Sequence, residues 1–417
     1  MSSNTIYRMG TANMYDNALR NLGARQTSLS NLQDNLTSGK RVVRASDDPV
    51  SAAQAERALT RICRIQTEQR ALETQRNAIA QAESAMGDAV SLVQNARELI
   101  VNAGNGTLAA NDRATIANQL QGLREQLSEV ANRKDTNGVP LLGALGSALA
   151  PFLGPLSGSP DYAFDGLPGQ NSSTGVAIPN TLDGDSAFMF DPQRDGVYNA
   201  SVSAVPNSRQ LTTDAVKATN LGAVTGNNYS IAFSAVGPGA TAGTSTVSYT
   251  VTNTTTGAVS PAVTVPDYPS SKPVTIAVAG IPGLSVNVTG NPDGDTITLQ
   301  PSASVFSTLD SAIRDIRSAP NSNAAIQAVG QALANLDAGL ERMHNMRGYA
   351  GELLNRADRI TGDQDKRAIQ LEGDRSRAED LDMIKGISDF QNQQVGYEAA
   401  LKSYAQVQKL SLFNFIS

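Results

Sequence analysis

Apolar residues recur at alternating spacings of three and four positions in both end regions of the chain, roughly the first 135 residues and the last 110. This spacing keeps one apolar stripe on one side of a helix, where a partner helix can cover it. Between the two regions, from about 136 to 304, apolar and polar residues alternate and Gly, Pro, Ser and Thr are abundant, which is typical of short strands joined by turns. We therefore predict an α+β multidomain protein, with a long antiparallel helical rod or coiled coil formed by both termini and an inserted, mainly antiparallel β domain.

The longest helical pattern runs from Val50 to about Ala103, without proline and with one internal glycine, Gly87. At about 1.5 Å per residue this helix is roughly 80 Å long, and that length favours a rod over an ordinary helical bundle, which would show the same stripes. Asp48 and Pro49 predict its start and the glycines after Ala103 its end. The predicted rod core is Ile79, Met86, Val93, Ile100, Leu120, Leu123, Leu127, Leu333, Leu336, Leu340 and Met343, with Ile326 in the same stripe.

Both extreme ends of the chain carry apolar residues repeated every seven positions. Chain ends are usually polar and frayed, so these ends are predicted to bury a face against each other and against neighbouring subunits. Because an amphipathic helix alone in water is marginal, we expect residues up to about 36 and from about 383 to order fully only on polymerisation. The predicted assembly interface is Tyr15, Leu22, Leu29, Leu32, Leu36, Ile387, Phe390, Tyr397, Leu401, Tyr404, Val407, Leu410 and Phe413.

The middle region predicts five strands, at 229–233, 247–251, 274–278, 284–288 and 296–299, whereas 141–175 is expected to have no regular structure. The shifts of composition give five segments. These are an N-terminal assembly helix and turn (1–45), the first part of the rod (46–135), a β-rich outer domain (136–304), the second part of the rod (305–380) and a C-terminal assembly helix (381–417).

Composition argues against most enzyme chemistry. The chain has no Trp, one His (His344) and one Cys (Cys63), so clustered metal ligands and a Ser–His–Asp arrangement are not available. Cys63 is expected to be an inert, partly packed thiol. The segment Asn291–Asp295 resembles the start of a calcium loop, but Ser302 stands where a bidentate Glu is needed, and a hairpin turn is the better interpretation. We predict no catalytic residue, no metal and no cofactor, although carboxylate chemistry in the β domain stays open.

Net charge and hydropathy limit the classes of partner that the chain is expected to bind. The net charge of −6 and the pI of about 5.0 argue against nucleic acid, which needs a basic face. No apolar run is long enough to span a bilayer, and no basic-then-apolar segment opens the chain, so neither a membrane nor a cleaved signal peptide is expected. The cytoplasm is the default compartment unless another export route applies.

Three stretches carry a resemblance to a known family. LTSGKRVVRASDDP (36–49) is similar to the turn after the first helix of flagellin-type proteins, and LVQNARELIVNAGNG (92–106) to the end of their long helix. VGYEAALKSYAQVQKLSLFNFI (395–416) resembles the C-terminus of the hook–filament junction branch of the flagellin family. Asp47-Asp48-Pro49 favours that branch, since filament flagellins tend to have Asp-Asp-Ala-Ala. The resemblance covers about 135 residues at the front and 110 at the back, and not the middle.

The resemblance implies a structural subunit, not an enzyme, that joins the hook to the filament by packing of its terminal helices. The implied partners are hook-associated protein 1, flagellin, other copies of itself in a ring, and an export chaperone that shields the C-terminal helix. It also implies secretion through the flagellar type III channel without a cleaved signal peptide. The alternatives are a filament flagellin and, further off, a coiled-coil surface protein outside the flagellum.

Overall fold

The computed structural model describes residues 11–158, 160–203, 211–269, 271–272, 274–277, 280–290 and 294–416, without the side chains of 11–15, 234–236, 275–277 and 407–416. The chain divides into two compact units. The terminal unit comprises Met1–Arg70 with Thr361–Ser417, and the central unit comprises Ala71–Ile360. Helices α2 (Pro49–Ala103) and α7 (Ser322–Glu379) contribute to both.

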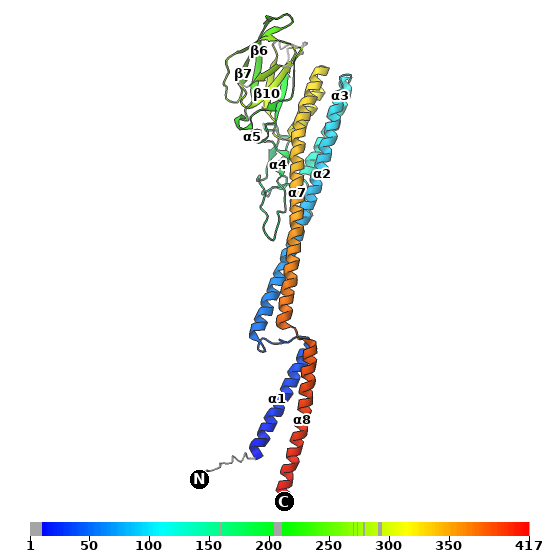
Figure 1. The fold of residues 1–417 in the computed structure, drawn as a ribbon. Coiled ribbons are helices and arrows are strands. Elements are labelled where there is room, and N and C mark those ends of the chain that lie inside the picture. The colour runs from blue at the N-terminus through cyan, green and yellow to red at the C-terminus, as the bar shows by residue number, and fades with distance from the viewer. Residues whose placement is uncertain are drawn as a thin grey trace, which may run out of the picture. The chain divides into compact units, whose positions relative to one another are not determined.

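The central unit is built on α2 and α7, which run antiparallel, with α3 (Ala110–Ala131) and α6 (Val305–Ser318) beside them (Figure 1). Arg76 pairs with Asp358 at 3.1 Å and Arg97 with Asp337 at 2.8 Å. Arg97 lies 21 residues after Arg76 (97 − 76) and Asp337 lies 21 residues before Asp358 (358 − 337), so the two helices keep one register between these pairs. A break at Pro320 separates α6 from α7.

The residues predicted for the rod core lie in the apolar cluster of the central unit. Eight are fully enclosed, at 0% exposure: Ile79, Met86, Val93, Ile100, Leu120, Leu127, Leu336 and Met343. Leu123, Leu333 and Leu340 are partly buried against the same cluster. Ile326, assigned to the stripe from the sequence, is 51% exposed. That assignment was wrong because Ala325 and Val329 take the buried side of the first turns of α7.

The described residues between 141 and 190 pack on the helices. Leu142, Phe152 and Phe188 are buried in the helical cluster, and the Phe152 ring lies 5.3 Å from that of Phe188 and 5.8 Å from that of Phe306. Strands β1 (Phe152–Leu153) and β2 (Ala163–Phe164) pair here, followed by α4 (Gly184–Phe188) and α5 (Pro192–Asp195). The expectation of no regular structure at 141–175 was therefore wrong for β1 and β2.

Two antiparallel sheets enclose a second core, which contains Tyr229, Ile231, Tyr249, Val286 and Leu299. The larger sheet has the order β3-β11-β6-β7-β8, and in the smaller sheet β10 pairs with β4, β5 and β9. A short 3-10 helix, η1 (Leu221–Ala223), precedes β6. The strands are β3 (Tyr198–Ser203), β4 (Thr212–Thr213), β5 (Lys217–Ala218), β6 (Tyr229–Pro238), β7 (Ser245–Asn253), β8 (Val263–Tyr268), β9 (Val274–Ala277), β10 (Leu284–Thr289) and β11 (Thr296–Pro301).

The five strand segments predicted from the sequence fall within β6, β7, β9, β10 and β11, which confirms them, except that Val278 lies outside the described residues. The hairpin turn predicted at Asn291–Asp295 also falls in part outside them, because 291–293 are not described. Strands β3 and β8 were not predicted.

Polar side chains at every fourth position of α7 attach the sheets to the helices. Gln327 donates to the Thr213 hydroxyl at 2.8 Å, and Gln331 donates to the Tyr198 carbonyl at 2.8 Å. The Gln331 amide oxygen accepts from two backbone N–H groups, of Ala200 and Val216, both at 3.4 Å. Gln331 is 7% exposed, so its amide replaces water for backbone groups that burial would otherwise leave unpaired.

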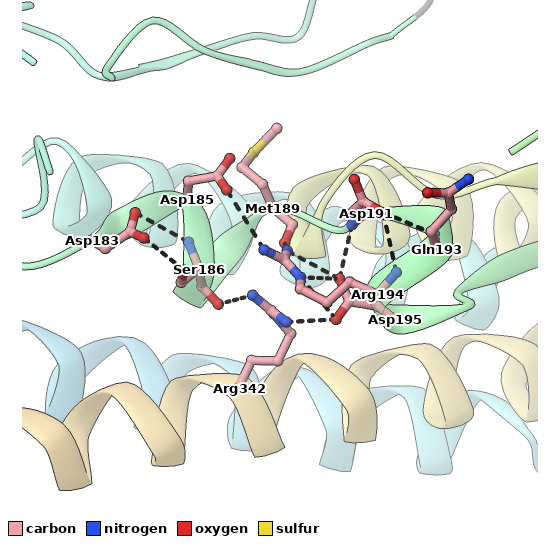
Figure 2. A network of polar contacts seen from close by, with 9 residues as sticks. All are labelled: Asp183, Asp185, Ser186, Met189, Asp191, Gln193, Arg194, Asp195 and Arg342. Atoms are coloured by element: carbon pink, nitrogen blue, oxygen red, sulfur yellow. Dashed lines mark hydrogen bonds and ion pairs between the residues drawn. The ribbon is translucent and has the colours of Figure 1, made fainter. Parts of the chain in front are cut away.

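A second attachment lies further along α7, where Arg342 reaches the short helices α4 and α5 (Figure 2). Its guanidinium pairs with Asp195 at 2.5 Å and donates to the Ser186 carbonyl. Arg194 donates to the Met189 carbonyl at 2.8 Å and also pairs with Asp195. Burial lowers the pKa of Arg342, while the charge of Asp195 acts in the opposite direction. The segment that leads into β3 is thus fixed on α7 by charge as well as by packing.

We predict that Gln331→Leu lowers the free energy of unfolding by about 2 kcal/mol, because the buried N–H groups of Ala200 and Val216 lose their hydrogen-bond acceptor. Urea unfolding followed by circular dichroism measures the change. Gln94→Leu, at an exposed site on α2, is the matched control and should stay within about 0.5 kcal/mol of the wild type. Equal effects of the two substitutions would contradict the attachment.

Candidate assembly surface

The terminal unit is organised around the loop between α1 (Thr11–Ser38) and α2. This loop pairs with the chain just after α7, where Leu381 N–H donates to the Gly39 carbonyl at 2.9 Å and Arg41 N–H donates to the Glu379 carbonyl at 2.7 Å. Gly39 has φ +69°, a conformation that glycine adopts without strain. Lys40 forms an ion pair with Glu379. These contacts hold the start of α2 and the end of α7 together.

Asp48 begins α2 from the same loop. Its carboxylate accepts from the Ser51 N–H at 3.1 Å and pairs with Arg41 at 3.2 Å. Arg41 also donates to the Ser51 hydroxyl and to the Ala378 carbonyl. Hydrogen bonds from the Ser51 side chain and backbone, with a smaller contribution from Arg41, lower the pKa of Asp48 to about 2. The charged carboxylate therefore caps the helix as the sequence predicted.

Helices α1 and α8 (Met383–Ile416) lie side by side (Figure 1). A Cβ on Gly386 would lie 2.8 Å from Cδ2 of Leu381, which precedes α8, and 3.2 Å from Cδ2 of Leu36 on α1, so the glycine leaves room for both leucine side chains. A groove of about 640 Å³ between them is lined by residues that include Leu22, Arg25 and Tyr404. The members of the predicted interface that are partly buried are Leu22, Leu29, Leu32, Leu36, Phe390, Tyr397 and Tyr404.

A second apolar set on α8 points to solvent. Ile384 is 85% exposed and Val395 67% exposed. They are eleven residues apart, about three turns, which places them on nearly the same side of the helix. Of the residues predicted for the interface, Ile387 (46%) and Leu401 (41%) are also exposed, but Leu401 lies about 100° round the helix from Ile384, nearer to the side of Phe390. The stripe predicted as one surface is therefore two, with one set of residues against α1 and another facing outward.

Some predicted interface residues cannot be placed. Tyr15 lies on the described backbone of α1, and Val407, Leu410 and Phe413 lie on that of α8, but the side chains of all four fall outside the described ones. The sequence prediction also missed Ile384 and Val395. Both lie off the seven-residue repeat, and only a search for apolar residues outside the repeat could have found them.

Metal sites and reactive side chains are the other features of interest in the described residues. These residues contain no group of three or more His, Cys, Asp or Glu side chains placed to hold a metal ion. His344 and Cys63 are both exposed. The expectation of a partly packed Cys63 was wrong, because Ile65, two residues on, takes the buried position. Within the same described part of the chain, no helix has the length and apolar character needed to cross a bilayer.

Comparison with known proteins gives consistent matches. Residues 9–145 match the family model of the bacterial flagellin N-terminal helical region. Flagellar hook-associated protein 3 of Salmonella typhimurium is 36% identical over 147 residues, which cover 35% of this chain and 46% of that protein. The chain thus spans about half the length of the curated relatives it matches.

Solved structures extend the similarity to most of the chain. The flagellar junction protein FlgL from Legionella pneumophila has 27% sequence identity and a TM-score of 0.56, covering 73% of this chain and 99% of that one. A second structure from Legionella pneumophila, of flagellar hook associated protein-3, has 25% identity and a TM-score of 0.59, covering 76% and 98%. The α+β arrangement of helices and sheets is common to these proteins.

We predict that the Asp48 carboxyl titrates with a midpoint near 2 and that Ser51→Ala moves it toward the ordinary value near 3.9, while Arg41→Ala moves it less. Because the folded pKa is depressed, the stabilisation is complete above about pH 4 and is lost as pH falls toward 2. Carbon-detected NMR titration of the carboxyl group measures the midpoint. An unchanged midpoint in Ser51→Ala would show that the Ser51 hydroxyl does not stabilise the Asp48 carboxylate.

Proposed function

Because this chain belongs to the flagellin family, we propose that it is a structural subunit of the bacterial flagellum that joins the hook to the filament. The observation that carries the proposal is the pair of terminal helices. Helix α1 covers one side of α8, and large apolar side chains remain exposed on another side. Isolated exposed apolar residues are common on soluble proteins, but a row of them on a terminal helix fits a surface that neighbouring subunits cover.

The energy of joining comes from burial. Each large apolar side chain that becomes fully buried contributes roughly 1.5–3 kcal/mol, and Ile384 and Val395 have most of their surface left to bury. The entropy lost on ordering the ends offsets part of this gain. Several such residues from each neighbour are therefore needed, which a closed ring of identical subunits provides.

Four partners follow from this function. We propose hook-associated protein 1 on one side, flagellin on the other, further copies of this chain around the ring, and an export chaperone that shields α8 before assembly. The names of the similar proteins, hook-associated and junction proteins of flagella, support these partners. In this proposal the chain has no catalytic activity, leaves the cell through the flagellar export channel without a cleaved signal peptide and is located at the hook–filament junction.

A filament subunit is the less supported alternative. It is favoured by the match of residues 9–145 to the flagellin N-terminal helical region. The curated relatives that match the chain are hook-associated proteins, which favours the junction.

The experiment that tests the function replaces the gene in the source bacterium. Cells without the gene should bear hooks without filaments and release flagellin into the medium, and the wild-type chain should restore filaments. Ile384→Ser with Val395→Ser should fail to restore them, because both side chains lose the apolar surface that assembly buries.

Two further measurements make this result specific. The melting temperature of the purified double variant should match that of the wild type, since exposed substitutions change stability by no more than about 0.5 kcal/mol. Ile369→Ser, on α7 and 73% exposed, is the matched control and should restore filaments. Normal filaments in cells without the gene would refute the junction role, and bundles made of this chain alone would favour the filament alternative.

A further inference from the structure

Two arginines line a groove of the terminal unit without an ion-pair partner. Arg57 and Arg61 are exposed on α2 and stand four residues apart, hence on one side of the helix. They border a groove of about 390 Å³ between α2 and α7. In the described helices, no other two exposed basic residues stand four positions apart with neither of them in an ion pair.

The floor of this groove suits a closely packed helix. Ala58 and Ala378 line it with small side chains, beside Leu371. The groove also contains Asp374 and Arg377, which pair with each other. Their charges cancel, so the charge presented to an incoming surface is that of Arg57 and Arg61, beside the exposed Glu56. Two positive charges at helical spacing fit two carboxylates at the same spacing.

The central unit presents such a pair of carboxylates on α3. Glu125 and Glu129 are exposed and stand four residues apart. In the described helices, no other two acidic residues have this spacing with neither of them in an ion pair. Gln121 donates to Glu125 at 3.2 Å. Arg124, immediately before Glu125, forms an ion pair with Asp310 at 2.9 Å. Arg133, four residues after Glu129, forms an ion pair with Asp88 at 2.7 Å.

The same side of α3 carries a glycine that no contact within the chain explains. Gly122 is inside the helix, three residues before Glu125, and a Cβ there would meet nothing within 4 Å. Glycine in a helix costs about 1 kcal/mol relative to alanine. The missing side chain narrows this part of α3 for entry into a groove.

We propose that Glu125 and Glu129 on α3 of one copy dock against Arg57 and Arg61 in the groove of a second copy. The two surfaces differ, so the contact is head-to-tail, and repetition of such a contact produces a ring or a helical tube. This inference rests on the proposed function, since it assigns one of the contacts between copies.

Charge reversal with rescue tests the contact in cells that lack the gene. Arg57→Glu with Arg61→Glu should reduce the number of cells with filaments on the order of tenfold, because like charges then oppose each other. Glu125→Arg with Glu129→Arg should do the same, and the four substitutions together should restore filaments. The matched control, Lys217→Glu with Lys272→Glu, changes the net charge as much as the first variant at exposed sites of the sheets and should leave filaments normal.

Cross-linking provides an independent measurement. In a Cys63→Ser background, which removes the exposed native thiol, Arg61→Cys with Glu125→Cys should give covalent oligomers in isolated flagella, and Lys217→Cys with Glu125→Cys should not. Wild-type-like reversal variants, or no oligomers from the first pair, would overturn the docking while leaving the junction role intact. Absence of the wild-type chain from isolated flagella would instead refute the proposed function.

Discussion

Antiparallel packing of α2 on α7 is the interaction on which the rest of the central unit depends. Small residues make it possible, because Ala82, Ala89 and Ala96 on α2 and Ala350 and Ala357 on α7 are all fully buried. Alanine has the highest helix propensity, so these buried positions favour the two long helices as well as their packing. The packed pair of helices in turn provides the surface on which the described residues between 141 and 190 pack. The sheets are then attached to its outer side through buried amides and the Arg342 ion pairs.

The terminal unit is held together by different interactions from those of the central unit. Its loop and the end of α7 are joined by backbone hydrogen bonds and ion pairs, whereas α1 and α8 leave several large apolar side chains in solvent. The exposed Ile384 and Val395 add little packing within the single chain, which fits the proposal that neighbouring subunits cover them. The proposed joining function and the proposed docking of α3 both use surfaces that have no partner within the described part of the single chain.

Much of the fold could be predicted from the sequence, because period and composition are local signals. The long helix from Pro49 was predictable from its cap, and the strands from β6 onward from their alternation. The packing of 141–190 was not, since Leu142 and Phe188 are buried by residues distant in the chain and carry no periodic pattern. For the same reason the repeat on α8 indicated an apolar helix but not which residues α1 would cover, and Ile384 and Val395 were missed.

The central claim is that the outward side of α8 becomes buried between subunits. Labelling of single cysteines at Ile384 and Val395 with a maleimide, in a Cys63→Ser background, measures this burial directly. The account predicts complete labelling of both sites in the purified monomer and strong protection in intact flagella, with a cysteine at Ile369 labelled in both. Equal labelling of Ile384→Cys in monomer and flagella would contradict it.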